Sequence, residues 1–488
     1  MTVAPAKPGT RASIAWRPVG LLVVVVAAAH VAVLTRYGWH RDEFYYVICG
    51  RHLAWGYPDQ PPLTHLLARL LDVAGLAGLR LGALASHLGC MLVTAALAAE
   101  FGGRRRAQVL AAAAVAVSPL FMGASMFFGT TIMDQLLWAV TVLLVVRAVR
   151  SPSPWRWLAS GISAGIGLEN KQTVAVLLVG ILVGLVVSKR DALRGPWPWM
   201  AGLVAAVCWL PNVVWDANHQ WANVRMAGVL AGKTGGPIGS GVTFIAILVA
   251  SPVLVVVAWA GVRRLRDGEH RWLVVTAITV VALFVLAGGK AYYPEPVFVV
   301  FIAAGAVAVE AAAAPRRLRP GWPVALGASF VAGAVVLLPV LPPAGASAIR
   351  PANPVLIETY GWPRLVAEIA DASRRVRIAT VTFTSNYGEA GALAFFARGV
   401  GLRLPVASGH NAYGDWGPPA GSDAAVLAVG EFDRPYLERF WASVTEIAPL
   451  TLPHGWTDEE TVNHAAIYLC QQPRGTWAEL WPRLRHLD

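Results

Sequence analysis

Residues 39–46 read Trp-His-Arg-Asp-Glu-Phe-Tyr-Tyr and follow the first apolar segment of the chain, residues 19–34. They open a polar and aromatic stretch that continues to residues 56–62, Gly-Tyr-Pro-Asp-Gln-Pro-Pro. Asp42 and Glu43 are therefore two adjacent carboxylates beside a segment long enough to enter a membrane. Ionisable groups next to hydrocarbon are costly, and where they occur they usually have a function. We therefore predict that this stretch forms the floor of an active site.

The composition is that of a protein that crosses a membrane many times. Of the 488 residues, 56% are hydrophobic and 14% are charged, and the mean hydropathy of +0.55 is outside the range of ordinary soluble proteins. The net charge is +12, but the basic residues lie in short clusters between apolar runs. This pattern is typical of cytoplasmic loops and not of a nucleic-acid-binding surface. We therefore predict no nucleic-acid partner.

About eleven apolar segments approach the length needed to cross a hydrocarbon core of about 30 Å. They cover residues 19–34, 82–99, 107–123, 135–149, 157–168, 172–187, 199–215, 242–262, 272–287, 297–314 and 323–340. Basic clusters precede the first segment and follow the second, fourth, sixth, eighth and tenth, so all lie on one side of the membrane. The first cluster includes Lys7 and Arg11, and the last consists of Arg316, Arg317 and Arg319. The positive-inside rule makes this side cytoplasmic, which directs the Asp42 stretch and the C-terminus outward.

The composition changes after Pro342-Pro343. We expect strands over residues 375–384, 424–429 and 465–469 and helices over 387–398 and 435–444, an alternation typical of α/β domains. Cys49 and Cys470 both fall on the predicted outer side, where a disulfide could form. The sequence thus predicts a polytopic α-helical membrane protein in three parts: a cytoplasmic tail over residues 1–18, a transmembrane catalytic domain over 19–343 with its first outer loop over 35–81, and an extracytoplasmic α/β domain over 344–488.

Isolated polar residues converge on the predicted outer face. Asp134 begins the fourth segment, Lys171 lies at the turn after the fifth, and Lys290 lies in the Gly-Gly-Lys-Ala-Tyr-Tyr-Pro loop of residues 288–294. Lysines neutralise phosphate, aromatic rings and polar donors suit sugars, and a carboxylate can take a proton from a hydroxyl. A lipid-linked sugar phosphate needs all three. Other interpretations stay open, since Asp134 could be a helix N-cap and Lys171 a lysine that reaches the membrane interface.

These motifs resemble, in the same order, the GT-C glycosyltransferases that use polyprenyl-phosphate sugars. That class includes the protein O-mannosyltransferases and the aminoarabinose transferases that modify lipid A. The resemblance covers residues 19 to about 340, and two later motifs, Asn-Tyr-Gly-Glu-Ala-Gly-Ala at 386–392 and Ser-Gly-His-Asn at 408–411, resemble the outer domain of actinobacterial-type members. The chain departs from the aminoarabinose transferases at Gln60, near which they carry a lysine. This difference argues against lipid A modification and favours Lys171 and Lys290 as phosphate ligands.

The resemblance implies an inverting, metal-independent hexosyl- or pentosyltransferase of GT-C architecture, without a cofactor, in a bacterial plasma membrane. Asp42 would be the general base, supported by Glu43. The donor phosphate would be held by Lys171 and Lys290, with Arg51 and Arg225 as weaker candidates. The remaining substrate-binding candidates are Tyr45, Tyr57, Asp59, Gln60, Asp134, His219, Tyr292 and Tyr293. The implied partners are a polyprenyl-phosphate sugar, such as one of mannose or a pentose, membrane lipids, and a glycan, lipid or protein acceptor.

Two functions of other classes compete with this hypothesis. A lipid-linked sugar transporter or flippase would favour inverted repeats and broken helices with charges at the membrane midplane. The sequence shows no such repeat, and its isolated charges lie at segment ends. A non-catalytic envelope scaffold would tolerate replacement of Asp42 by asparagine.

Overall fold

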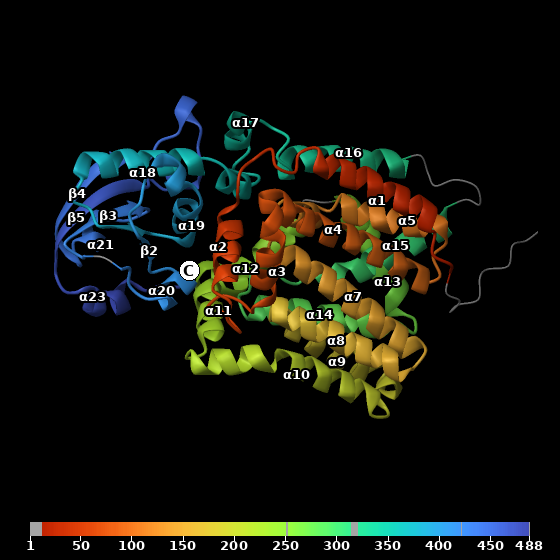
Figure 1. The fold of residues 1–488 in the computed structure, drawn as a ribbon. Helices are drawn as coiled ribbons and strands as arrows, with labels where there is room; N and C mark the ends of the chain where they lie inside the picture. The colour runs from red at the N-terminus through yellow and green to blue at the C-terminus, as the bar shows by residue number, and fades with distance from the viewer. Residues whose placement is uncertain (1–11, 250–251, 314–320, 421, 488) are drawn as a thin grey trace, which may run out of the picture. The chain divides into compact units, whose positions relative to one another are not determined.

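The structure, a computed structural model, describes residues 12–249, 252–313, 321–420 and 422–487. The chain forms two compact units whose segments alternate along the sequence (Figure 1). The first unit combines Met1–Leu34, Gln60–Thr64 and Arg80–Leu338, and the second combines Thr35–Asp59, His65–Leu79 and Pro339–Asp488. Residues 35–59 therefore group with the C-terminal segment.

The first unit is helical. Its longer helices are α1 (Trp16–Val31), α4 (Gly75–Glu100), α7 (Thr130–Arg150), α8 (Pro154–Asn170), α9 (Thr173–Ser188), α10 (Trp197–Asn218), α13 (Pro252–Arg266), α14 (Arg271–Leu286) and α16 (Gly321–Leu337). The shorter ones are α5 (Arg105–Ala116), α6 (Pro119–Ala124), η2 (Arg190–Leu193), α11 (Ala222–Lys233), α12 (Gly236–Val249), η3 (Glu295–Phe298) and α15 (Val299–Ala312). The helices α3 (Leu63–Leu71) and α4 run across the division between the units.

Each predicted apolar segment falls on helix within the described residues. Segment 107–123 is divided between α5 and α6 because Pro119, at the first position of α6, lacks the N–H needed to continue the ladder of α5. Segment 242–262 falls on α12 and α13.

Four described stretches are long and apolar enough to cross a membrane, Leu63–Glu100, Thr130–Arg150, Trp197–Asn218 and Glu295–Ala312, and several shorter helices are also apolar. The count of eleven spans and their orientation stay predictions. Lys7, Arg11, residue 314, Arg316, Arg317 and Arg319 lie outside the described residues.

Small residues bring helices of the first unit into backbone contact. A Cβ added at Gly305 of α15 would lie 1.8 Å from the Val257 carbonyl oxygen of α13, and one at Gly261 of α13 would lie 2.0 Å from that of Phe301. Close approach through glycine is typical of helix pairs in membranes, where burial of apolar surface from water does not drive association. The small residues thus determine how α13 and α15 pack.

The second unit contains a five-stranded sheet. Its strands are β1 (Val381–Thr384), β2 (Val406–Ser408), β3 (Ala425–Gly430), β4 (Trp441–Pro449) and β5 (Ala466–Pro473). Their order is β2-β1-β3-β5-β4, with β1 parallel to β2 and β3, and with β5 antiparallel to β3 and β4. The expected small α/β sheet in the C-terminal segment is therefore present.

Helices cover both faces of this sheet (Figure 1). The helices that lie wholly within the second unit are α2 (Arg41–Arg51), η1 (Asp72–Ala74), α17 (Pro343–Ala348), η4 (Pro354–Thr359), α18 (Trp362–Val376), α19 (Tyr387–Phe396), η5 (Ala397–Val400), α20 (Ala412–Asp415), α21 (Arg434–Leu437), η6 (Pro453–Gly455), α22 (Glu459–Val462) and α23 (Trp477–Leu484). Leu427 and Val429 of β3 pack with α18 and α19 in one core, while Val426 and Ala428 pack with α23 in another. This alternation follows the two-residue period of a strand.

Several local predictions for this unit were wrong. The expected strand over 375–384 is confined to β1, because α18 extends to Val376 and Arg377 ends it with a φ of 49°. The expected helix over 435–444 gives way to β4, which pairs with β5 from Trp441 onward. The strand β2 was not predicted. The predicted first outer loop, residues 35–81, contains α2, α3, η1 and the start of α4, and its location outside the membrane stays a prediction. Cys49 and Cys470 are buried and form no disulfide.

Candidate active site

The second unit holds Asp42 in the first turn of α2, and the residues around it explain why the helix begins there. His40 has an extended backbone, and its Nδ1 accepts a hydrogen bond of 3.1 Å from the Asp42 N–H. The His40 N–H in turn donates to the buried Glu43 carboxylate at 2.9 Å. This reciprocal capping satisfies N–H groups that a helix start leaves unpaired. Glu43 thus fixes the geometry that presents Asp42.

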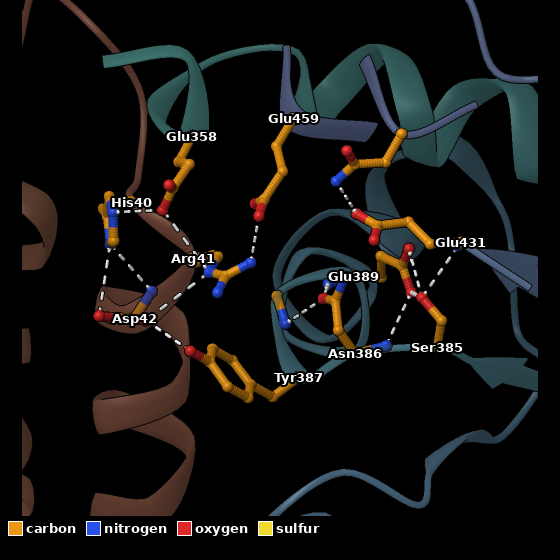
Figure 2. Close-up of polar contacts among 12 residues, drawn as sticks. His40, Arg41, Asp42, Glu358, Ser385, Asn386, Tyr387, Glu389, Glu431 and Glu459 are labelled. Carbon is orange, nitrogen blue, oxygen red and sulfur yellow. Dashed lines mark hydrogen bonds and ion pairs between the residues drawn. The ribbon is translucent and has the colours of Figure 1, made fainter. Parts of the chain in front are cut away.

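The Asp42 carboxylate is held by groups that favour its negative charge (Figure 2). The Tyr387 hydroxyl donates a hydrogen bond of 2.8 Å to Asp42 Oδ1, although 345 residues separate the two in sequence. The Arg41 Nε lies 3.9 Å from Oδ1, and the His40 Nδ1 lies 3.9 Å from Oδ2. The side chain keeps 28% of its surface exposed. Asp42 is therefore an oriented carboxylate that solvent or a substrate can still reach.

Arg41 and His40 connect Asp42 to acidic residues of the C-terminal segment (Figure 2). Arg41 forms an ion pair with Glu459, and its Nε lies 3.6 Å from Glu358. His40 Nε2 lies 2.9 Å from the same Glu358 carboxylate. Burial opposes the charge on His40, but Asp42 and Glu358 outweigh it and raise the His40 pKa. Glu358 and Glu459 therefore stabilise the charged form of Arg41, while the helix cap requires the His40 Nδ1 to be unprotonated.

The predicted residues Tyr45, Tyr57 and Asp59 lie in the same unit. The buried Tyr45 hydroxyl donates a hydrogen bond of 2.6 Å to Asp59 Oδ1, and its ring centroid lies 4.6 Å from that of Tyr387. Burial raises the pKa of Asp59 to about 7, assisted by the charge of Asp42 and opposed by the Tyr45 hydrogen bond. The Tyr57 hydroxyl instead donates to backbone carbonyl groups, including that of Cys49 at 3.0 Å. Tyr45 and Asp59 thus extend the polar site, while Tyr57 stabilises its backbone.

A second polar cluster lies in the first unit. Lys171 ends α8, and its Nζ lies 4.4 Å from the ring centroid of Tyr293 and 5.5 Å from that of Tyr292. Burial lowers the pKa of Lys171 to about 8, with Lys290 adding to this effect and Asp134 opposing it. Asp134 Oδ2 accepts a hydrogen bond of 2.8 Å from Thr173. The turn between α8 and α9 therefore brings Lys171 together with Tyr292 and Tyr293 and within electrostatic reach of Asp134 and Lys290.

The interpretation of Asp134 as a helix N-cap was wrong. The N-cap of α7 is Gly129, and Asp134 is buried inside the helix. Because its side chain faces Thr173 and interacts with Lys171, it belongs to the lysine cluster.

The other predicted residues are His219, Arg225, Arg51 and Gln60. His219 and Arg225 are exposed, and Arg225 donates to the His219 carbonyl at 3.3 Å. Within the described residues, no hydrogen bond or ion pair joins either to Asp134, Lys171 or Lys290. Arg51 ends α2, lies 3.3 Å from Asp72 and stacks on Phe395. Gln60 is buried in the first unit.

Sequence reasoning missed several partners. Tyr387, Glu358 and Glu459 contact the Asp42 region from the C-terminal segment, and only Tyr387 lay within a motif that the sequence singled out. In the first unit, Gln135 Nε2 donates to the buried Glu295 at 2.9 Å, and Thr64 donates to Asn170 at 2.7 Å. Glu295 directly follows the Tyr-Tyr-Pro loop, which was its only signal.

Comparisons with known proteins agree with the motifs. The family model of the dolichyl-phosphate-mannose-protein mannosyltransferases matches residues 59–215. The fold is similar to ArnT from Cupriavidus metallidurans bound to undecaprenyl phosphate, with a TM-score of 0.56 and 16% identity over 93% of this chain and 98% of that one. The apo state of ArnT gives a TM-score of 0.55 and 14% identity, over 92% and 98%.

Arabinofuranosyltransferase AftD from Mycobacteria has a TM-score of 0.49 and 12% identity, over 96% of this chain and 41% of that one. No curated protein sequence matches the chain. The predicted resemblance to the GT-C membrane glycosyltransferases is thus confirmed, by a family model over residues 59–215 and by a fold shared with ArnT over nearly the whole chain.

Proposed function

We propose that this protein is a membrane glycosyltransferase that transfers a sugar from a polyprenyl-phosphate donor to an acceptor hydroxyl, with inversion and with Asp42 as general base. The observation that carries the proposal is the Asp42 carboxylate itself, oriented at a helix start by Tyr387 and still partly exposed. The family match and the fold shared with ArnT, which was solved with undecaprenyl phosphate, support a lipid-linked donor.

In this reaction the acceptor oxygen attacks the anomeric carbon while its proton passes to Asp42. The bond between the anomeric carbon and the phosphate oxygen breaks, and polyprenyl phosphate leaves with the bonding electrons. A correctly placed general base contributes about 10²- to 10⁴-fold to such a rate. Because attack and departure occur on opposite faces of the sugar, a single transfer inverts the anomeric configuration.

Lys171 and Lys290 hold the donor phosphate in this proposal. Asp134, which accepts a hydrogen bond from Thr173, and Lys290 both act on Lys171, and the Asp134 carboxylate balances part of the lysine charge. Lysine ammonium groups neutralise phosphate as point charges. Tyr292 and Tyr293, whose rings pack against Lys171, complete the binding surface.

The proposed site faces outward from a bacterial plasma membrane, since the basic clusters assign the opposite side to the cytoplasm. The donor sugar is mannose or a pentose, and the acceptor is a glycan, a lipid or a protein. The α/β segment after residue 343 is extracytoplasmic in this topology.

The decisive test replaces Asp42 with asparagine, which keeps the shape of the side chain and removes the base. In proteoliposomes supplied with synthetic polyprenyl-phosphate sugars, we expect Asp42→Asn to lower transfer at least about a hundredfold. Asp267→Asn is the matched control, because that carboxylate pairs only with its exposed neighbour Arg266 within the described residues and is itself exposed. Full transfer by Asp42→Asn would contradict the mechanism. Movement of the lipid-linked sugar across the bilayer without any transfer would instead favour a flippase.

A further inference from the structure

The motif at residues 386–392 forms the start of α19. The Asn386 side chain caps the helix by accepting hydrogen bonds from the Gly388 N–H at 2.8 Å and the Glu389 N–H at 3.1 Å. The buried Glu389 carboxylate accepts from the Asn386 N–H at 3.1 Å and from Ser385 (Figure 2). Because this cap is closed on both sides, the backbone of Tyr387, the first residue of the helix, is fixed.

Two glycines of the motif allow α19 to pack closely against α2. A Cβ at Gly388 would lie 2.7 Å from the Arg41 Cβ, and one at Gly391 would lie 2.4 Å from the Phe44 Cβ. Contacts this short between Cβ atoms cannot be relieved by rotating a side chain. The glycines therefore bring Tyr387 within hydrogen-bonding distance of Asp42, which follows Arg41 in α2.

The Tyr387 side chain is fixed along its whole length. The residue is 9% exposed, and its ring centroid lies 4.6 Å from that of Tyr45 and 4.7 Å from that of His410. The Arg41 guanidinium lies 5.5 Å above the ring, an arrangement that favours the cation. The hydroxyl at the end of this ring donates to Asp42 at 2.8 Å.

We propose that Tyr387 is a positioning residue for the transfer reaction, whose hydroxyl orients the Asp42 carboxylate and keeps it ionised. This inference rests on the proposed function of Asp42. It assigns the motif at residues 386–392, and with it the C-terminal segment, a part in the active site.

The electrostatics around Asp42 determine the sign of the effect. A hydrogen bond donated to a carboxylate favours its charged form and lowers its pKa. Burial raises the pKa of Tyr387 far above its usual range, and the nearby Asp42 adds to this, so the phenol stays protonated and can donate. The charged or titratable groups that face Asp42 or its neighbour Arg41 include His40, Asp59, Glu358 and Glu459. None of these contacts is removed when Tyr387 becomes phenylalanine.

The test compares the pH dependence of kcat and kcat/KM in full-length wild type and Tyr387→Phe, reconstituted with a synthetic polyprenyl-phosphate sugar. Because a hydrogen bond to a charged group is strong, we expect its loss to move the acidic limb of the profile to higher pH by roughly one unit. The KM for the donor should stay unchanged. Tyr413→Phe is the matched control, since its buried hydroxyl has no hydrogen-bond partner among the described residues.

An infrared titration provides the same comparison without turnover. The band of the protonated Asp42 carboxyl is the one that Asp42→Asn removes, and in Tyr387→Phe it should persist to higher pH than in wild type. If the pH profiles and the infrared titration of Tyr387→Phe both coincide with those of wild type, the inference about Tyr387 is wrong, even where Asp42→Asn is inactive. If Asp42→Asn transfers sugar normally, the proposed function of Asp42 fails instead, and the infrared shift alone then decides whether Tyr387 keeps Asp42 ionised.

Discussion

Lys171 lies at a turn where its charge depends on pH. Its ammonium packs against two tyrosine rings, and burial lowers its pKa to about 8. The positive charge is therefore complete well below pH 8 and is lost as the pH rises through that value. The phosphodiester of a polyprenyl-phosphate sugar does not titrate in this range, so any change in donor binding comes from the protein.

We predict that the donor KM of the wild type rises about tenfold between pH 7 and 9, as Lys171 loses its proton. Lys171→Arg should abolish this rise, because arginine stays protonated. Initial rates over a range of donor concentrations at each pH measure the effect. Lys189→Arg, at the other end of α9, is the matched control and should follow the wild type. A wild-type KM that stays constant over this range would show that Lys171 does not hold the phosphate.

At the scale of single residues, the sequence identified the ionisable groups but not their partners. Asp42 and Glu43 could be identified because they are two adjacent acids beside an apolar segment. Lys171 and Lys290 could be identified because they are isolated from the basic clusters. The sequence could not show that Glu43 closes a helix cap through His40, since histidine is not a usual N-cap. It could not show that Tyr387 bonds Asp42, because 345 residues separate them.

Packing between elements explains most of the local errors. The segment 435–444 carries charges that favour an exposed helix, yet Trp441 and Val444 are buried and β4 pairs with β5. Tertiary pairing there overrides local propensity. Apolar helices were predicted more reliably, because a membrane span needs a long apolar run whatever its neighbours are.

The contact between α2 and α19 can be tested at Gly391. Alanine favours a helix by up to about 1 kcal/mol over glycine, but the new Cβ would lie 2.4 Å from the Phe44 Cβ. Overpacking of this kind costs about 1–3 kcal/mol, so we expect the clash to exceed the gain. Gly391→Ala should lower the thermal unfolding midpoint in detergent and reduce transfer.

Gly399→Ala is the control for this prediction, because a Cβ at Gly399 would meet no atom within 4 Å. It should leave both the unfolding midpoint and the transfer rate close to those of wild type. If Gly391→Ala also left the unfolding midpoint and the transfer rate unchanged, the close approach of α19 to α2 would not be needed for stability or for transfer.

At the scale of the whole molecule, composition predicted a boundary near residue 343, and the C-terminal part of the second unit begins at Pro339. Composition gave no sign that residues 35–59 group with that part. Composition does not reveal this grouping because the partners of α2 are single aromatic and charged residues scattered over the C-terminal segment. Phe44, for example, packs against Trp362, Phe395 and Phe396.

Removal of residues 339–488 should therefore abolish transfer although ten predicted spans remain whole and the eleventh, 323–340, loses only its last two residues. The truncation removes Tyr387, which donates a hydrogen bond to Asp42, and it removes Glu358 and Glu459, the acidic partners of Arg41. It also exposes Phe44, which is completely buried in the whole protein. We expect trypsin to cleave the truncated chain at Arg41 faster than the full-length chain, as mass spectrometry of the peptides from residues 35–59 would show. Co-expression of residues 339–488 as a separate chain is the control, and it should restore protection if the two parts reassemble. A truncated protein that transfers sugar at the full-length rate would show that the membrane helices alone complete the site.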